Sequence, residues 1–167
     1  MTVFNVSSVA MLWLCCTAAW AQGQACEVRV SPPAFDFGLT DRGALLQQSA
    51  GANELSFGSR RVQVQVVCDQ ASPLTLRFDA PGADAERYRF GIGTLRLRVM
   101  AVRVDGVATQ KAAGESDVLR PGERLLPLLA SGKRMEVEFE VEGQISNEAS
   151  RVADLTRLDG EGVFRLD

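Results

Sequence analysis

Residues 135–142 read Met-Glu-Val-Glu-Phe-Glu-Val-Glu and alternate strictly between apolar and acidic side chains. Because successive side chains of a β-strand point to opposite faces of a sheet, this stretch predicts a strand with one buried and one solvated face. Runs with the same period occur at residues 26–31, 34–38, 61–68, 74–79, 95–104 and 164–166. Turn-forming residues separate these runs, and Asp105–Gly106 is a typical hairpin turn.

About seven short strands favour an all-β fold, because a sheet with one apolar face must bury it against a second sheet. We therefore expect an antiparallel β-sandwich. No repeat or linker divides the chain, so residues 22–167 are predicted to form a single domain. Two segments have no clear period. Residues 43–55 are expected to form a loop or an edge strand, and residues 147–158 either a short helix or another strand.

The first 21 residues differ from the rest of the chain. They carry no charged side chain, and the apolar run at residues 9–21 ends in Ala19-Trp20-Ala21, a small-x-small cleavage pattern. The run is shorter than the roughly 20 residues that span a bilayer. Residues 1–21 are therefore predicted to be a secretory signal peptide, with no transmembrane segment in the mature chain. The alternative is a buried hydrophobic helix at the N-terminus.

The cysteines lead to a second prediction about export. Cleavage after residue 21 removes Cys15 and Cys16, and it leaves Cys26 and Cys68 in the mature chain. In an exported protein, one remaining pair of cysteines most simply forms one disulfide. We therefore expect a bond between Cys26 and Cys68, with two free buried thiols as the alternative.

The composition excludes several classes of function. The chain has 18 Lys and Arg, 21 Asp and Glu, and a net charge of −3, which argues against nucleic-acid binding. It has no His, which removes Ser-His-Asp and Cys-His catalysis as well as His-ligated metals. Asp154, Asp159 and Glu161 do not have the spacing of a calcium loop. We predict no catalytic, metal or cofactor site.

The four glutamates between residues 136 and 142 are the one acidic set that could suggest an enzyme site. Paired carboxylates can hydrolyse glycosidic bonds, but one carboxyl group must be desolvated enough to stay protonated. Four glutamates on one wet strand face would all remain ionised. The sequence therefore predicts a solvated face at Glu136, Glu138, Glu140 and Glu142, paired with arginines on neighbouring strands. The candidate arginines are Arg96, Arg98 and Arg103.

The order of these features resembles a pilus (fimbrial) subunit of the chaperone–usher pathway. After the predicted signal peptide come Cys-Glu-Val-Arg-Val at residues 26–30 and Phe-Asp-Phe-Gly at residues 35–38. The second cysteine closes the strand at residues 62–68. The segment 159–167 is similar to that family's last strand, with glycines ahead of it and an apolar penultimate residue, Leu166.

The resemblance implies an immunoglobulin-like antiparallel β-sandwich that lacks its final strand. In that family a periplasmic chaperone lends the missing strand, and the extension of a neighbouring subunit later replaces it. The implied partners are the chaperone, an outer-membrane usher and neighbouring pilus subunits, on a fimbria at the cell surface. The implied groove is lined by six apolar residues of the first and last strands: Val28, Val30, Phe35, Phe37, Phe164 and Leu166.

The segment before the first cysteine suggests a place in such a fibre. Between the predicted cleavage site and Cys26 lie only residues 22–25, too few to fill a groove of about 10 residues. We therefore expect a subunit that accepts a strand but donates none, at the tip or as a minor component. A ligand on a host or other surface fits this role, although no motif specifies one. The alternative function is a self-contained secreted β-sandwich that binds carbohydrate or another surface.

Overall fold

The structure, a computed structural model, describes residues 26–49, 53–111, 116–152 and 158–167. The predicted signal peptide, the segment 22–25 and Asp154 lie outside these residues. Antiparallel strands form most of the described chain, and they are arranged in two sheets. No helix of the described part is long and apolar enough to cross a membrane. The expected all-β, sandwich-like fold is confirmed.

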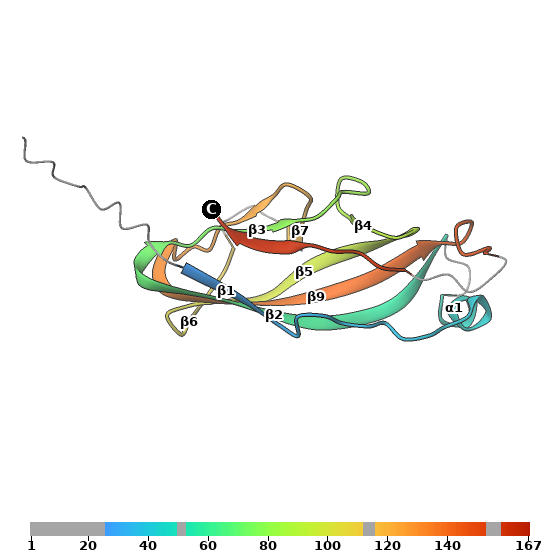
Figure 1. Cartoon of the computed structure of the whole chain (residues 1–167), viewed down its shortest axis with the longest axis horizontal. Coiled ribbons are helices and arrows are strands. Elements are labelled where there is room, and N and C mark those ends of the chain that lie inside the picture. Colours follow the sequence, from blue (N-terminus) through green and yellow to red (C-terminus); the bar gives the residue numbers. More distant parts are fainter. Residues whose placement is uncertain (1–25, 50–52, 112–115, 153–157) are drawn as a thin grey trace, which may run out of the picture.

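The larger sheet has three long strands at its centre and shorter ones around them (Figure 1). Its main path runs β1 (Cys26–Ser31), β2 (Glu54–Pro73), β9 (Ser131–Ser146), β5 (Gly93–Val104) and β4 (Tyr88–Phe90). Two further strands also pair with β5, namely β6 (Val107–Thr109) and β7 (Val118–Leu119). The smaller sheet has the order β10 (Val163–Leu166), β3 (Leu76–Asp79) and β8 (Arg124–Leu125).

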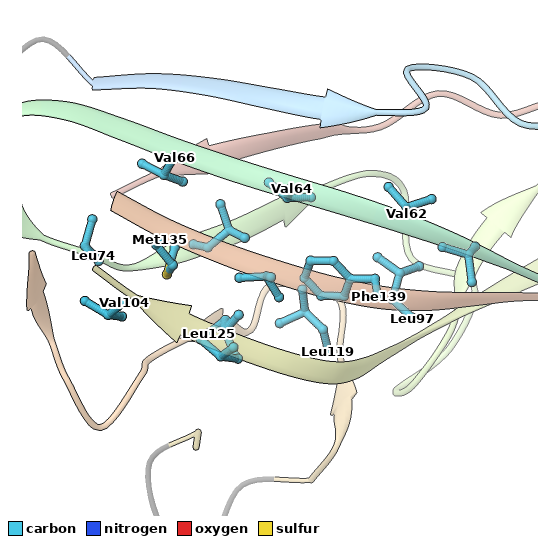
Figure 2. Packing of buried hydrophobic residues seen from close by; sticks show 14 of the residues in the cluster. Val62, Val64, Val66, Leu74, Leu97, Val104, Leu119, Leu125, Met135 and Phe139 are labelled. Atoms are coloured by element: carbon cyan, nitrogen blue, oxygen red, sulfur yellow. The ribbon is translucent and has the colours of Figure 1, made fainter. Parts of the chain in front are cut away.

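The core lies between the two sheets (Figure 2). On β9 the apolar members of the alternating run are buried and the glutamates face outward, as the sequence predicts. The neighbouring strands supply the other walls of the core. Its fully buried large side chains include Val64, Val66, Leu74, Leu76, Tyr88, Leu97, Leu119, Leu125, Met135, Val137 and Phe139.

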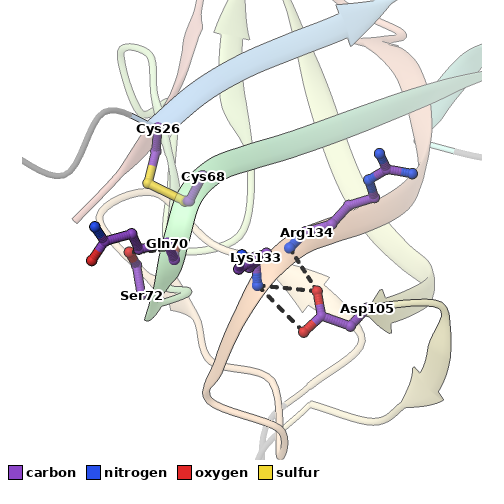
Figure 3. The surroundings of a disulfide bond; sticks show 7 residues. All are labelled: Cys26, Cys68, Gln70, Ser72, Asp105, Lys133 and Arg134. Atoms are coloured by element: carbon purple, nitrogen blue, oxygen red, sulfur yellow. Dashed lines mark hydrogen bonds between the residues drawn. A yellow bond between two sulfur atoms is a disulfide. The ribbon is translucent and has the colours of Figure 1, made fainter.

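The predicted β5–β6 hairpin is confirmed. Asp105 and Gly106 have φ angles of 49° and 82°, the left-handed conformation that both central residues of a type I′ turn require. The Asp105 carboxylate also accepts hydrogen bonds from the backbone N–H groups of Lys133 and Arg134 (Figure 3). This turn therefore ties the end of β5 to the start of β9.

The segment 43–55 differs from its prediction as a loop or an edge strand. A short helix, α1 (Arg42–Gln48), occupies its first part, and β2 begins at Glu54. Asp41 caps this helix, because its side chain accepts a hydrogen bond from the Ala44 N–H. Leu45 is buried against Leu55 and Ile145 in a second, small core. One buried turn of helix leaves too few apolar positions to show a helical period in the sequence.

Two other expectations change. Residues 34–38 form no strand, because the chain leaves the sheet at Pro32 and Pro33, which cannot donate ladder hydrogen bonds. Of the segment 147–158, residues 147–150 form a turn in which the Ser150 N–H donates to the Ser146 carbonyl. Residues 153–157 lie outside the described chain, so the choice between helix and strand there stays a prediction.

Candidate functional site: two unpaired strand edges

Strands β1 and β10 each pair on one side only within the described chain. β1 pairs with β2, and β10 pairs with β3. They run in opposite directions in Figure 1, and the start of β1 lies near the end of β10. A hollow of about 390 Å³ opens there, lined by Cys26, Ser72, Pro73, Leu166 and Asp167. We term the space between the two free edges the β1–β10 gap.

The disulfide shows which backbone groups of β1 face the gap. Cys26 and Cys68 are directly opposite each other and bonded, as predicted, with their Cα atoms 4.1 Å apart (Figure 3). This short spacing is typical of a non-hydrogen-bonded antiparallel pair. Because the two kinds of pair alternate, Val28 and Val30 are of the same kind. The N–H and C=O groups of Cys26, Val28 and Val30 therefore point away from β2, toward the gap.

The same reasoning applies to β10. The Asp167 N–H donates to the Thr75 carbonyl at 2.9 Å, so this position is hydrogen-bonded toward β3. Alternation makes Arg165 hydrogen-bonded toward β3 as well. Phe164 and Leu166 are then the residues whose N–H and C=O groups point to the free side of β10.

The free backbone groups of β1 and β10 are positioned so that a single inserted strand could form hydrogen bonds with both edges. On both edges, the residues with free backbone groups also turn their side chains toward the core. A strand between oppositely directed edges is antiparallel to one and parallel to the other. In an antiparallel ladder the directly opposite residue makes the bonds, whereas in a parallel ladder its two flanking residues do. Core-facing residues of an inserted strand can therefore bond to one edge while its outward-facing residues bond to the other.

The core is incompletely covered along the gap. Val28, Val30, Phe164 and Leu166 pack against the main core, but each is only half-buried. By contrast, Val64 and Val66 on the adjacent strand β2 are fully buried. The structure thus brings together four of the six predicted groove residues on the two facing edges.

Two aromatic rings outside the predicted set hold β10 on the core. The centroid of the Phe164 ring lies 4.7 Å from that of Phe78 and 5.1 Å from that of Phe139. The sequence predicts both residues as members of alternating strands, but no pattern indicates that they stack on Phe164. Gly162 brings the chain close to Phe78, since a Cβ atom there would come within 2.0 Å of that ring.

Phe35 and Phe37 lie apart from the β1–β10 gap, in the extended segment beyond the end of β1. The Phe37 ring makes edge contacts with Phe35 and Phe90, at centroid distances of 5.5 and 5.8 Å. It also covers Gly143, where an added Cβ would come within 3.0 Å of the ring. The Arg60 guanidinium lies 5.4 Å from the Phe37 centroid. These rings cover the core past the end of β1.

The outward faces of the two edge strands carry charged pairs. On β1, Arg29 donates to Glu27 at 2.8 Å, and this hydrogen bond lowers the pKa of Glu27. On β10, Arg165 lies 3.1 Å from Asp79 of β3. The solvent side of the gap is therefore polar, while its inner side is apolar.

The glutamates of β9 face outward, as predicted. Of the three candidate arginines, Arg98 forms an ion pair with one of them, whereas Arg96 lies 3.8 Å from Glu86. The register places Arg96 opposite Glu142, Arg98 opposite Glu140 and Arg103 opposite Glu136. An ion pair joins Arg98 and Glu140 at 3.8 Å, and on the other side Arg61 reaches Glu138 at 3.1 Å. No group of metal-ligating side chains occurs among the described residues.

Tyr88 is a buried titratable group in the core. Its side chain is fully buried, and its ring packs edge-on against Phe78 at a centroid distance of 4.9 Å. Its hydroxyl group has no hydrogen-bond partner among the described residues. Burial, with the nearby charges of Glu123 and Asp79, raises the pKa of Tyr88. The hydroxyl therefore stays neutral in the folded protein and is unsuited to act as a base.

No protein-family model, curated protein or solved structure matches this chain.

Proposed function

We propose that this protein is a non-enzymatic subunit of a surface fibre that accepts an extended strand from another protein in the β1–β10 gap. The observation that carries the proposal is the match between the edges. Both present their free backbone groups at Cys26, Val28, Val30, Phe164 and Leu166, whose side chains face an incompletely covered core. An unpaired edge favours pairing with another chain, and an apolar strip beside it adds buried surface.

The resemblance to chaperone–usher pilus subunits supplies the proposed partners. A periplasmic chaperone would cover the gap after export, and an extension of a neighbouring subunit would replace it at the usher. The predicted signal peptide and the disulfide, which is typical of oxidising compartments, support this route to the cell surface.

Hydrogen exchange with a strand peptide tests the proposal directly. The probe is a synthetic peptide that copies the alternating N-terminal extension of a chaperone–usher pilus subunit, added to the mature protein. We expect new protection at the amides of Val28, Val30, Phe164 and Leu166, because these edge groups, like that of Cys26, have no ladder partner on the gap side within the described chain. Protection at β4 or β6 instead, or no protection at all, would contradict strand acceptance at this gap.

A pair of matched variants tests the role of the apolar strip in the cell. Phe164→Asp with Leu166→Asp places two charges on the inner side of β10, so we expect loss of chaperone co-purification and rapid proteolysis. The control is Val152→Asp with Val163→Asp, which adds the same charge at exposed apolar positions. The control should accumulate normally. A self-contained binding module, the alternative function, would stay monomeric, need no chaperone and take up no peptide.

We further propose that the subunit sits at the tip of the fibre or is a minor component. The segment 22–25 carries no large apolar side chain that could fill a partner's gap. Purified protein released from the chaperone should therefore take up the peptide without forming chains with itself. Self-polymerised ladders on a gel would show that it also donates a strand.

A further inference from the structure

The two walls of the β1–β10 gap are held very differently. We propose that β1 is a fixed wall and β10 a movable one, and that an ionic latch on the smaller sheet controls its opening. This inference rests on the proposed function for its purpose, but the movement itself is a property of the isolated protein.

The gap must widen to admit a strand. Neighbouring strands lie about 4.8 Å apart, so two strands that flank a third are about 10 Å apart. In the structure, some Cα atoms of β1 and β10 already lie within 8 Å of each other, although the two strands do not pair. At least one wall therefore has to move by a few ångströms.

Strand β1 is the firmly held wall. Its first residue is covalently bonded to β2 through the disulfide between Cys26 and Cys68, and all six of its residues are paired with β2. β2 itself pairs along most of its length with the central strand β9. The chain that follows β1 is anchored in turn, because Phe37 packs over Gly143 and beneath Arg60.

Strand β10 is held by a much smaller structure. It pairs through four residues with β3, and β3 pairs through two with β8. No disulfide joins this sheet to the rest of the described chain. Apart from the ladder, its attachments are the packing of Phe164 and Leu166 on the core and a set of charged contacts on the outer face.

Those contacts form a continuous chain across all three strands, which we term the ionic latch: Arg165, Asp79, Arg77, Asp167 and Arg124. Asp79 lies between Arg165, at 3.1 Å, and Arg77, at 2.8 Å. The Asp167 carboxylate lies 2.8 Å from the Arg124 guanidinium and 3.5 Å from that of Arg77. Because the side chains of Asp167 and Arg77 are only 21% and 31% exposed, water screens this network less than an open surface pair.

Backbone hydrogen exchange of the mature protein alone tests this inference. The Arg165 and Asp167 amides report release of β10 from β3, because their N–H groups bond to β3 on the side away from the gap. The Glu27 and Arg29 amides report opening of β1. In dilute buffer we expect the β10 amides to exchange faster than the β1 amides. Asp167→Asn should accelerate the β10 amides about fivefold, the upper range for loss of a partly exposed ion pair, and leave the β1 amides unchanged.

Two comparisons make the result decisive. Glu138→Gln breaks the pair with Arg61 on the other sheet, and it should leave β10 exchange unchanged. Molar salt should accelerate the wild-type β10 amides more than those of Asp167→Asn, in which only the pairs of Asp79 with Arg165 and Arg77 remain of the latch. Equal exchange at both walls, or no response of β10 to Asp167→Asn, would overturn the inference. Because no partner is present, this outcome is independent of whether the protein takes up a strand peptide.

Discussion

The centre of the larger sheet and the margins at β1 and β10 are built from the same kind of sequence. Both alternate between apolar and polar residues, and both turn the apolar ones toward the core. They differ in their neighbours. β9 has a long strand on each side, and its Val137 is fully buried, whereas Val28 and Phe164 have a strand on one side only and stay half-buried. Alternation thus predicts which face is apolar, while topology decides whether that face is covered.

Because of this difference, the central strands serve mainly folding stability, whereas β1 and β10 are available for binding. The central strands provide the buried area that keeps the chain folded, and their polar outer face needs no partner. The margins contribute less to folding because their apolar surface is only partly removed from water. They instead offer hydrogen-bonding groups and an apolar strip to a second chain.

The largest expected effect compares two phenylalanines that touch each other. Phe139 is fully buried on β9, and Phe164 is half-buried on β10, with ring centroids 5.1 Å apart. Phe139→Ala should lower the free energy of unfolding by about 4 kcal/mol, through lost transfer energy and a new cavity. Phe164→Ala should cost about half as much, because water already reaches one side of the ring. Urea denaturation measures both.

The two variants should also diverge in the presence of the strand peptide. Bound peptide would bury Phe164, so peptide binding should weaken in Phe164→Ala. If the two variants lose equal stability without peptide, Phe164 at the margin is shielded from water as well as Phe139 at the centre, which would contradict an open gap.

The next largest loss of stability is expected on removal of the disulfide. Cys26→Ser with Cys68→Ser removes a covalent link across 42 residues, which in the chain-entropy model stabilises by about 4 kcal/mol. We expect a loss of about 3 kcal/mol in urea denaturation, since removed native disulfides cost about 2 to 5 kcal/mol. The amides of β1 should lose protection before those of β9. Uniform loss of protection across both strands would mean that the bond stabilises the whole sandwich and does not fix one wall.

Much of this fold could be predicted from the sequence because most strands have one wet face. The runs at residues 61–68, 95–104 and 135–142 are all parts of long strands, and the disulfide follows from the pair of cysteines that the predicted cleavage after residue 21 would leave. The short strands β4, β7 and β8 were missed, because two or three residues cannot display a period. Helix α1 was missed because only Leu45 of it is fully buried.

The candidate site could be predicted only in part, for a different reason. Val28, Val30, Phe164 and Leu166 are inward members of terminal strands, and their positions follow from alternation. Phe35 and Phe37 also alternate, but the prolines before them take the chain out of the sheet, so they pack past the end of β1. The ionic latch depends on the β10–β3–β8 pairing, which joins residues far apart in the sequence.

A smaller effect concerns Tyr88, which lies under the smaller sheet against Phe78. Burial raises its pKa above the usual value near 10, so the folded state holds this proton more tightly than the unfolded state. Its contribution to stability is therefore fully present below pH 10, and it is lost as pH rises beyond that value. Because Tyr88 is the only tyrosine, tyrosinate absorbance reports it alone. We expect no ionisation of the folded protein near pH 10, and a single transition that coincides with unfolding.

Tyr88→Phe provides the control for this titration. It keeps the ring and removes a hydroxyl group that has no partner among the described residues, so stability at pH 7 should change by less than about 1 kcal/mol. The variant should also lose less stability above pH 10 than the wild type. Ordinary titration of Tyr88 near pH 10 in the folded protein would show that water reaches the core from the open margin.

The smallest effect compares an ion pair on the central sheet with the ionic latch. Arg61 and Glu138 lie 3.1 Å apart on neighbouring long strands, but their side chains are 76% and 38% exposed. A double-mutant cycle with Arg61→Ala and Glu138→Ala should give a coupling energy of at most about 0.5 kcal/mol, because water and salt screen this pair. The equivalent cycle for Arg77 and Asp167 should give a larger value, up to about 1 kcal/mol, since both are less exposed and share further partners. A larger coupling for the pair on β2 and β9 would reverse this ranking. Charges on the central sheet would then help to set its register, and β10 would be held by its apolar packing alone.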